Sequence, residues 1–267
     1  MSIAQESSAK TARVTTHRPW FRLPVMSGFI DRRMLVNFRV AAEVLAKILP
    51  APFRPRLVQG WGMAGICLIR LRAVRPRELP AWLGLTSENA AHRIAVEWDE
   101  NGTSREGVFI PRRDTGLWLN RVAGGRIFPG EHHAADFRVD EAAGRYDLEV
   151  RSRDGAMRVK VAARLAQALP QASVFGSMAE ASAFFEGGAV GWSVTRRGDV
   201  FDGLELRSFD WRVEPLAVDE VESSFFSDAR QFPAGTVAFD SALLMRGIQH
   251  EWHGCGRMLC PGPPHDL

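Results

Sequence analysis

Stretches in which apolar and polar side chains alternate with a period of two recur along most of this chain. In residues 157–165, Met157, Val159 and Val161 share one face, while Arg158 and Lys160 share the other. This period is typical of a β-strand that buries one face. Similar segments predict further strands at 57–74, 93–98, 107–110, 135–139, 145–151, 191–195 and 204–213. So many short strands bury their apolar residues best in a curved sheet or a barrel.

Two segments have helical character instead. Residues 37–49 place an apolar stripe on one face and stop at a Pro-Ala-Pro segment. A second helix is predicted after Ser177, an N-cap residue with Glu180 three positions on, and it ends at Gly187-Gly188. The expected fold class is therefore α+β: a mainly antiparallel curved sheet or barrel with a few short helices.

No repeat or linker divides the chain, so a single domain is expected at residues 19–253. Residues 1–18 are polar, lack the hydrophobic core of a secretory signal and are predicted to form a disordered leader. The glycine- and proline-rich residues 254–267 are predicted to form a flexible tail. No apolar run approaches the roughly 18–20 residues that cross a bilayer, so no membrane span is expected.

The charged residues argue against nucleic-acid binding. The formal net charge is only +3, and almost all of the 34 cationic residues are arginines interspersed with acids. The three cysteines, Cys67, Cys255 and Cys260, are too few for a disulfide framework and fit a reducing cytoplasm.

Metal-capable side chains gather near the end of the chain, at His250, His253, Cys255, Cys260 and His265. Their spacing, His-x2-His-x-Cys-x4-Cys, matches none of the common zinc patterns. No metal site is expected.

Lysine is rare, at positions 10, 47 and 160 only. A lysine that forms an imine usually needs burial or a neighbouring cation to lower its pKa. Lys47 lies on the polar side of the predicted helix, and Lys160 lies on the arginine-bearing face of its strand. Both are expected to be solvated, which argues against a catalytic amine.

The segment 124–133 is punctuated by glycines and ends in His132-His133, just before a predicted strand. Adjacent residues at the start of a strand point to opposite sides, so only one of these histidines can face an interior cavity. Imidazole can act as an acid, a base or a metal ligand near neutral pH. The pair could equally cap the strand without any chemical role.

Several motifs occur in an order and spacing that resemble a known family. They lie at 49–55 (LPAPFRP), 66–70 (ICLIR), 87–93 (SENAAHR), 107–111 (GVFIP), 125–133, 183–185 (AFF) and 211–215 (WRVEP). With them the chain resembles, over almost all of residues 19–253, the uncharacterised bacterial YqjF-like family of the acetoacetate decarboxylase-like superfamily. The resemblance implies a sheet curved into a cone or barrel around one central pocket.

In the decarboxylases of that superfamily, a Gly-Arg-led segment delivers two consecutive lysines into the pocket, and one of them forms an imine with a β-keto acid. Those positions correspond to His132 and His133, and histidine cannot form that imine. A pocket glutamate of the decarboxylases corresponds to Glu88. The resemblance therefore implies a similar pocket with a different mechanism.

The candidate site combines these residues with nearby cationic side chains. The predicted catalytic residues are His132, His133 and Glu88, with Glu88 as a proton carrier. The predicted substrate-binding residues are Arg93, Arg112, Arg126 and His92, because an arginine can hold a carboxylate through two hydrogen bonds. His92 and Arg93 are adjacent, so at most one of them faces inward. Arg112 could equally belong to a solvated turn.

Two functions stay open at this point. The first is an enzyme that acts on a small carboxylate or keto-acid-like metabolite by acid-base chemistry, with a lyase or isomerase-like reaction and no cofactor. The second is a non-catalytic ligand-binding or interaction protein, whose cavity would be apolar and whose histidines would face solvent. In both cases the expected partner is a small molecule, and a homo-oligomer is not excluded.

Overall fold

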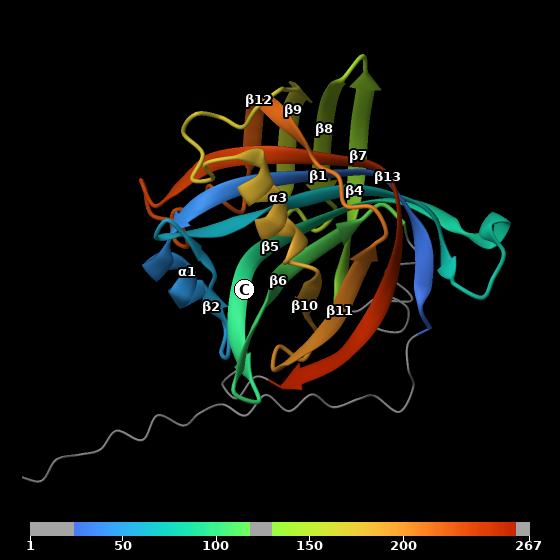
Figure 1. Ribbon diagram of the computed structural model, residues 1–267, viewed down its shortest axis with the longest axis horizontal. Coiled ribbons are helices and arrows are strands. Elements are labelled where there is room, and N and C mark those ends of the chain that lie inside the picture. Colours follow the sequence, from blue (N-terminus) through green and yellow to red (C-terminus); the bar gives the residue numbers. More distant parts are fainter. Residues whose placement is uncertain (1–23, 118–129, 260–267) are drawn as a thin grey trace, which may run out of the picture.

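The computed structural model describes residues 24–117 and 130–259. Within them, 13 strands and two short α-helices follow one another along the chain (Figure 1). The strands are β1 (Met26–Ala41), β2 (Arg54–Pro55), β3 (Leu57–Val58), β4 (Trp61–Pro76), β5 (Leu85–Glu100), β6 (Thr103–Thr115), β7 (His132–Ala142), β8 (Arg145–Ser152), β9 (Arg158–Leu165), β10 (Val190–Val194), β11 (Val200–Ser208), β12 (Glu214–Ser223) and β13 (Val237–Leu259). The helices are α1 (Ala42–Ile48) and α3 (Met178–Glu186), with a 3-10 turn, η1, at Ala81–Leu83.

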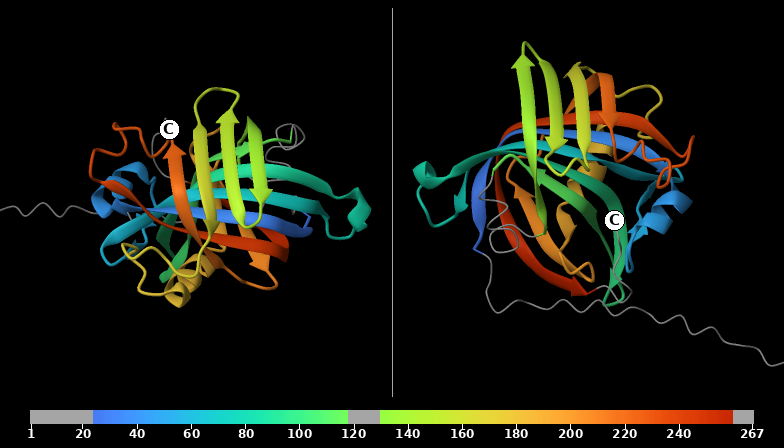
Figure 2. Two further views of the ribbon diagram at one scale, coloured as in Figure 1. Left: turned by 90° about the horizontal axis from the view of Figure 1, so that it is seen from above. Right: turned by 180° about the vertical axis from the view of Figure 1, so that it is seen from behind.

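The strands form one mixed, mainly antiparallel sheet in the order β11-β10-β6-β7-β8-β9-β12-β13-β1-β4-β5-β2, and β3 pairs with β4. Two additional pairings, of β11 with β13 and of β6 with β5, close part of this sheet into a ring. The ring runs β5-β4-β1-β13-β11-β10-β6 and returns to β5, so it is a seven-stranded barrel. Figure 2 shows the long strands curving around this ring.

The two faces of the ring strands β1, β4 and β5 pack against different parts of the protein. One face lies against β8, β9 and β12, which stand nearly upright across the long strands in Figure 1. The core between them includes Val36, Ile66, Ile94, Val159 and Leu216, all almost fully buried. The other face looks into the ring. Alternation along each strand therefore assigns neighbouring residues either to the core or to the ring interior.

Helix α3 packs inside one part of the ring. Its Phe184 and Phe185 contact a cluster that contains Leu35 and Cys67. The helix begins as the sequence predicts, because the Ser177 side chain accepts a hydrogen bond from the Glu180 backbone N–H at 3.1 Å. The predicted end at Gly187 is also confirmed.

The α+β class and the curved, mainly antiparallel sheet are confirmed, but some boundaries are wrong. The predicted helix at 37–49 begins only at Ala42, because residues 37–41 continue β1 and pair with both β13 and β4. The predicted strand at 204–213 ends at Ser208.

The predicted flexible tail also differs at its start. Residues 254–259 continue β13 and pair with β11 as far as Leu259, opposite Val200. Glycine suits this approach: Gly203 of β11 pairs with Gly256 of β13, and a Cβ on Gly203 would lie only 3.0 Å from the Cβ of Cys255. Among the described residues, no helix is long and apolar enough to cross a membrane.

Replacing the α3 cap tests its contribution to stability. Ser177→Ala removes the hydrogen bond to the Glu180 N–H and should lower the free energy of unfolding by about 1 kcal/mol. Urea denaturation followed by circular dichroism measures the change. Ser104→Ala, at an exposed strand position, is the control and should change stability by less than about 0.5 kcal/mol. Equal effects of the two variants would contradict the role of the cap.

Candidate functional site

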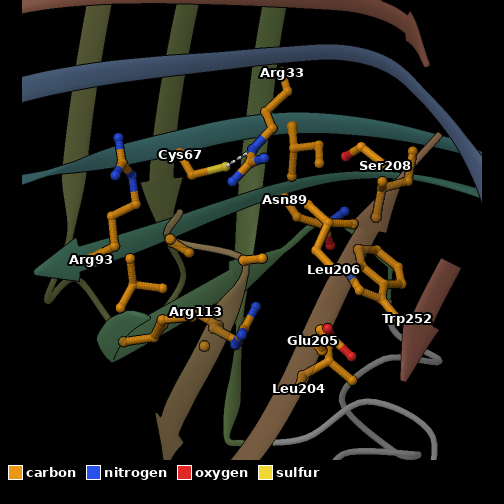
Figure 3. Close-up of a pocket in the computed structure, with 18 of the residues that line it drawn as sticks. Arg33, Cys67, Asn89, Arg93, Arg113, Leu204, Glu205, Leu206, Ser208 and Trp252 are labelled. Atoms are coloured by element: carbon orange, nitrogen blue, oxygen red, sulfur yellow. Dashed lines mark hydrogen bonds between the residues drawn. The ribbon is translucent and has the colours of Figure 1, made fainter. Parts of the chain in front are cut away.

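A cavity of about 430 Å³ lies inside the seven-stranded ring (Figure 3). All seven strands of the ring and the end of α3 contribute to its wall. Its polar and charged lining consists of Arg33, Cys67, Asn89, Arg93, Arg113, Asp114, His132, Glu186, Glu205, Arg207 and Ser208. Its larger apolar lining residues are Ile69, Leu71, Val108, Ile110, Phe185, Leu204, Leu206, Trp211 and Trp252.

Three arginines reach this cavity from three strands, and each of them contacts a group other than a carboxylate. Arg33 on β1 directs Nε at the sulfur of Cys67, at 3.4 Å. Arg93 on β5 donates to the side-chain oxygen of Asn37, and its guanidinium carbon lies 4.9 Å from the centre of the Phe185 ring. Arg113 on β6 donates from Nε to the hydroxyl of Ser193 at 2.9 Å.

Within the described part of the chain, no carboxylate oxygen lies within 4.0 Å of these three guanidinium groups. The arginines on the neighbouring faces are ion-paired, as Arg32, Arg70 and Arg112 show. Two acids of the cavity wall are already engaged: Asp114 with Arg112 and Glu205 with Arg207. The cavity therefore presents positive charge without a matching acid at these arginines.

Burial lowers the pKa of two of these arginines. Desolvation lowers the pKa of Arg93 to about 10, with nearby Arg33 also lowering it and Cys67 opposing the shift. Desolvation also lowers the pKa of Arg113 to about 10. Both stay protonated at neutral pH, so they remain available to hold an anion.

His132 is the histidine of the predicted pair that lines the cavity. Its Nδ1 lies 3.3 Å from the carbonyl oxygen of Gly130, which can only accept, so Nδ1 carries the proton and Nε2 is the ring's acceptor. Burial, and secondly the charge of Arg113, lowers the pKa of His132 to about 3. The imidazole is therefore neutral at physiological pH.

Two residues adjacent to His132 and Arg113, namely His133 and Arg112, lie outside the cavity lining, as the alternation of strand residues predicts. His133 directs Nδ1 at Asp154, 3.2 Å away. Arg112 pairs with the same Asp154 and with the buried Asp114. Neither His133 nor Arg112 lines the cavity.

His92 and Glu88, both on β5, also lie outside the cavity lining. His92 is fully buried in the core, where its ring centre lies 4.6 Å from that of Phe225 and its Nε2 is 3.4 Å from the hydroxyl of Ser223. Glu88 accepts hydrogen bonds from Arg32 and Arg70, each at 2.6 Å, in an ion-pair network on the opposite face. Asn89, the next residue, faces the cavity instead.

Of the seven predicted site residues, the structure thus brings His132 and Arg93 together in one cavity. Arg126 lies outside the described residues. The sequence interpretation missed Arg33 and Arg113 as cavity residues. Arg113 pairs directly with His132 in the parallel register of β6 and β7, a long-range pairing that the sequence pattern does not reveal.

The metal-capable side chains near the end of the chain are spread along β13. His250 is fully buried, and His253 bonds Glu251 at 2.8 Å. In residues 24–117 and 130–259, no group of three or more His, Cys, Asp or Glu side chains is arranged to hold a metal ion. Cys260 and His265 lie outside these ranges.

Comparison with solved structures defines the class of fold. The chain is similar to an acetoacetate decarboxylase from Legionella pneumophila, with a TM-score of 0.55 and 11% identity over 91% of this chain and 92% of that one. It is also similar to the enduracididine biosynthesis enzyme MppR complexed with pyruvate, with a TM-score of 0.57 and 11% identity over 95% and 94% of the two chains. These likenesses establish an acetoacetate decarboxylase-like fold, as expected from the motifs.

The family follows from the sequence match. Residues 30–196 match domain-of-unknown-function family 2071, described as an uncharacterized conserved protein, and the chain belongs to that family. A search of curated proteins gives no match. The expected membership in an uncharacterised group with this fold is confirmed.

Burial of His92 predicts a dependence of stability on pH. Desolvation, and secondly the charge of Arg112, lowers the pKa of His92 in the folded protein to about 3, from the value of 6.5 expected in the unfolded chain. Because the unfolded chain binds the proton more readily, this stability is present above pH 6.5 and is lost as pH falls from 6.5 toward 3. At pH 5 the loss should be about 2 kcal/mol.

His92→Phe keeps a planar ring and removes this titration. The decrease in unfolding free energy between pH 7.5 and pH 5 should therefore be about 2 kcal/mol smaller in the variant than in the unchanged protein. Denaturant titrations at the two pH values measure it. Phe225→Leu, which disturbs the same packing without removing a titrating group, should keep the original pH dependence. An unchanged pH dependence in His92→Phe would refute the argument.

Proposed function

We propose that the cavity binds a small carboxylate or keto acid and transfers a proton at the carbon next to its carbonyl group, without an imine. The observation that carries this proposal is the meeting of Arg33, Arg93 and Arg113, without carboxylate partners, with the neutral imidazole of His132. Such a lining suits an anion that also offers an acidic C–H bond.

The cavity arginines would bind the carboxylate group of the ligand. A guanidinium group matches the two oxygens of a carboxylate with two parallel hydrogen bonds, and it does so more strongly where water is excluded. A second guanidinium group nearby would stabilise negative charge that develops on a carbonyl oxygen.

His132 supplies the proton-transfer half. The C–H bond next to the carbonyl breaks, its proton moves to Nε2, and the electron pair moves to the carbonyl oxygen as an enolate. Bound carboxylate would offset the positive charge of Arg113, which is one cause of the low pKa of His132. Anion binding would therefore remove the second cause of the low pKa of His132, while burial, the first cause, would stay.

The lysines support a mechanism without an imine. Lys160 bonds Glu220 at 2.8 Å, and this hydrogen bond raises its pKa. Lys47 is exposed on α1. Neither lines the cavity. A similar fold, that of MppR, holds pyruvate in one of its structures, which supports a small keto acid as the ligand class.

Binding is tested first with pyruvate as the probe, by isothermal titration calorimetry. Arg113→Met should weaken binding at least about tenfold, because it removes a buried charge that faces the anion. Arg138→Met is the control, since Arg138 is an exposed strand arginine outside the cavity, and it should leave the affinity unchanged. Equal affinity in both variants would refute the assignment of the anion site.

Catalysis is tested by proton exchange. The methyl protons of pyruvate in D₂O, followed by NMR, should exchange faster in the presence of the protein than in its absence. The exchange rate that the protein adds should be at least about 100-fold lower with the His132→Gln variant. His253→Gln, at a histidine outside the cavity, should retain it. Tight binding without accelerated exchange would instead identify a ligand-binding protein that does no chemistry.

A further inference from the structure

The cavity has a cationic side and an aromatic side. In Figure 3, Arg93 and Arg113 lie on one side of the cavity, while Leu206 and Trp252 lie on the other. The strand register gives the same order. Arg113 lies opposite Ala91 on β5, whereas Trp252 is paired with Leu206 at the far end of the curved strands.

Apolar side chains connect the two sides. Arg33 is paired with Ile69 on β4, and Leu71 follows two residues later on the same face. Leu71, Leu206, Trp211 and Trp252 belong to one apolar cluster at that end of the ring. A molecule anchored at the arginines would therefore extend along Ile69 and Leu71 toward Trp252.

The cavity is too large for a minimal keto acid. Its volume is about 430 Å³. A three-carbon keto acid has only six non-hydrogen atoms, so it would leave the apolar half of the cavity filled with water.

Trp252 is held in a fixed position on that side. Its ring centre lies 4.5 Å from that of His250, and the two rings meet at 68°. His250 itself is fully buried, whereas Trp252 is only half-buried. A rigid indole whose remaining surface faces a cavity offers a flat apolar wall to a second ring.

We propose that the ligand of this cavity is a carboxylate with an aromatic substituent, whose ring packs against Trp252 while its carboxylate meets the arginines. This inference rests on the proposed anion site and adds the chemical class of the rest of the ligand. Trp252 is thereby a specificity-determining residue. It selects aryl-substituted acids over small ones through burial of the ring, and it takes no part in proton transfer.

The test compares pyruvate with phenylpyruvate, which has the same keto acid group and an added phenyl ring. In the unchanged protein, phenylpyruvate should bind about 10–100 times more tightly, as expected for burial of a phenyl group. Trp252→Ala should abolish most of this ratio, because it should weaken the binding of phenylpyruvate much more than the binding of pyruvate. Trp252→Phe, which keeps an aromatic wall, should retain most of the ratio. Trp82→Ala, at an exposed tryptophan outside the cavity, is the control and should change neither affinity.

The outcomes separate the two proposals. If pyruvate binds in an Arg113-dependent way but phenylpyruvate binds no more tightly, or the ratio survives Trp252→Ala, the aromatic ligand is refuted and the anion site stands. If neither acid binds the unchanged protein, the anion site fails, and the aromatic ligand fails with it. If Trp252→Ala does not fold, the ratio of the affinities for phenylpyruvate and pyruvate is compared between Trp252→Phe and the unchanged protein. A ratio near one in the unchanged protein overturns the inference.

Discussion

The pairing of β11 with the last half of β13 is the constraint on which the cavity depends. It joins two strands of the chain's second half, which are separated in the sequence by β12, and it closes part of the curved sheet into a ring. Without it, β10 and β11 would be attached only through β6, and Leu206 would not face Trp252 across the ladder. Gly203 suits this close approach, since a Cβ there would lie only 3.0 Å from the Cβ of Cys255 on β13. The site is thus a consequence of sheet closure more than of any single loop.

Strand alternation then divides adjacent cationic residues between two environments. Arg32 and Arg33 on β1 are one example: Arg32 is 2% exposed and pairs with Glu88 and Glu141, while Arg33 looks into the cavity. Arg112 and Arg113 on β6 divide in the same way. A one-residue shift in register would exchange the members of each pair, which would bring neutralised arginines to the cavity and bury the unpaired ones in the core. Correct register is therefore a condition for both stability and the proposed binding.

Strand alternation predicts some features of the candidate site and leaves others undetermined. Alternation predicts the strand class and the opposite directions of His132 and His133, because both follow from local geometry. It does not predict which of the two histidines faces the cavity, since that depends on the long-range pairing of β7 with β6.

Glu88 shows a second feature that the sequence does not predict. Its correspondence to a pocket glutamate is reasonable from its position in the chain, yet Arg32 and Arg70 hold it on the other face, and these partners are 56 and 18 residues away. The helix at 37–49 fails for a similar reason. Residues 37–41 have an apolar pattern that suits a helix, but two neighbouring strands supply backbone partners that a helix would forgo.

The cavity arginines that lack an ion-pair partner also indicate why the protein keeps this cavity. Burying a charge without an ion-pair partner costs free energy, and burial accordingly lowers the pKa values of Arg93 and Arg113. Hydrophobic residues at these positions would pack the interior and make the ring more stable. A bound anion would instead recover the lost free energy and stabilise the folded state in proportion to its concentration. Three such charges around one cavity are therefore better explained by a ligand than by the fold, and the neutral imidazole beside Arg113 places an acid-base group where that ligand would lie.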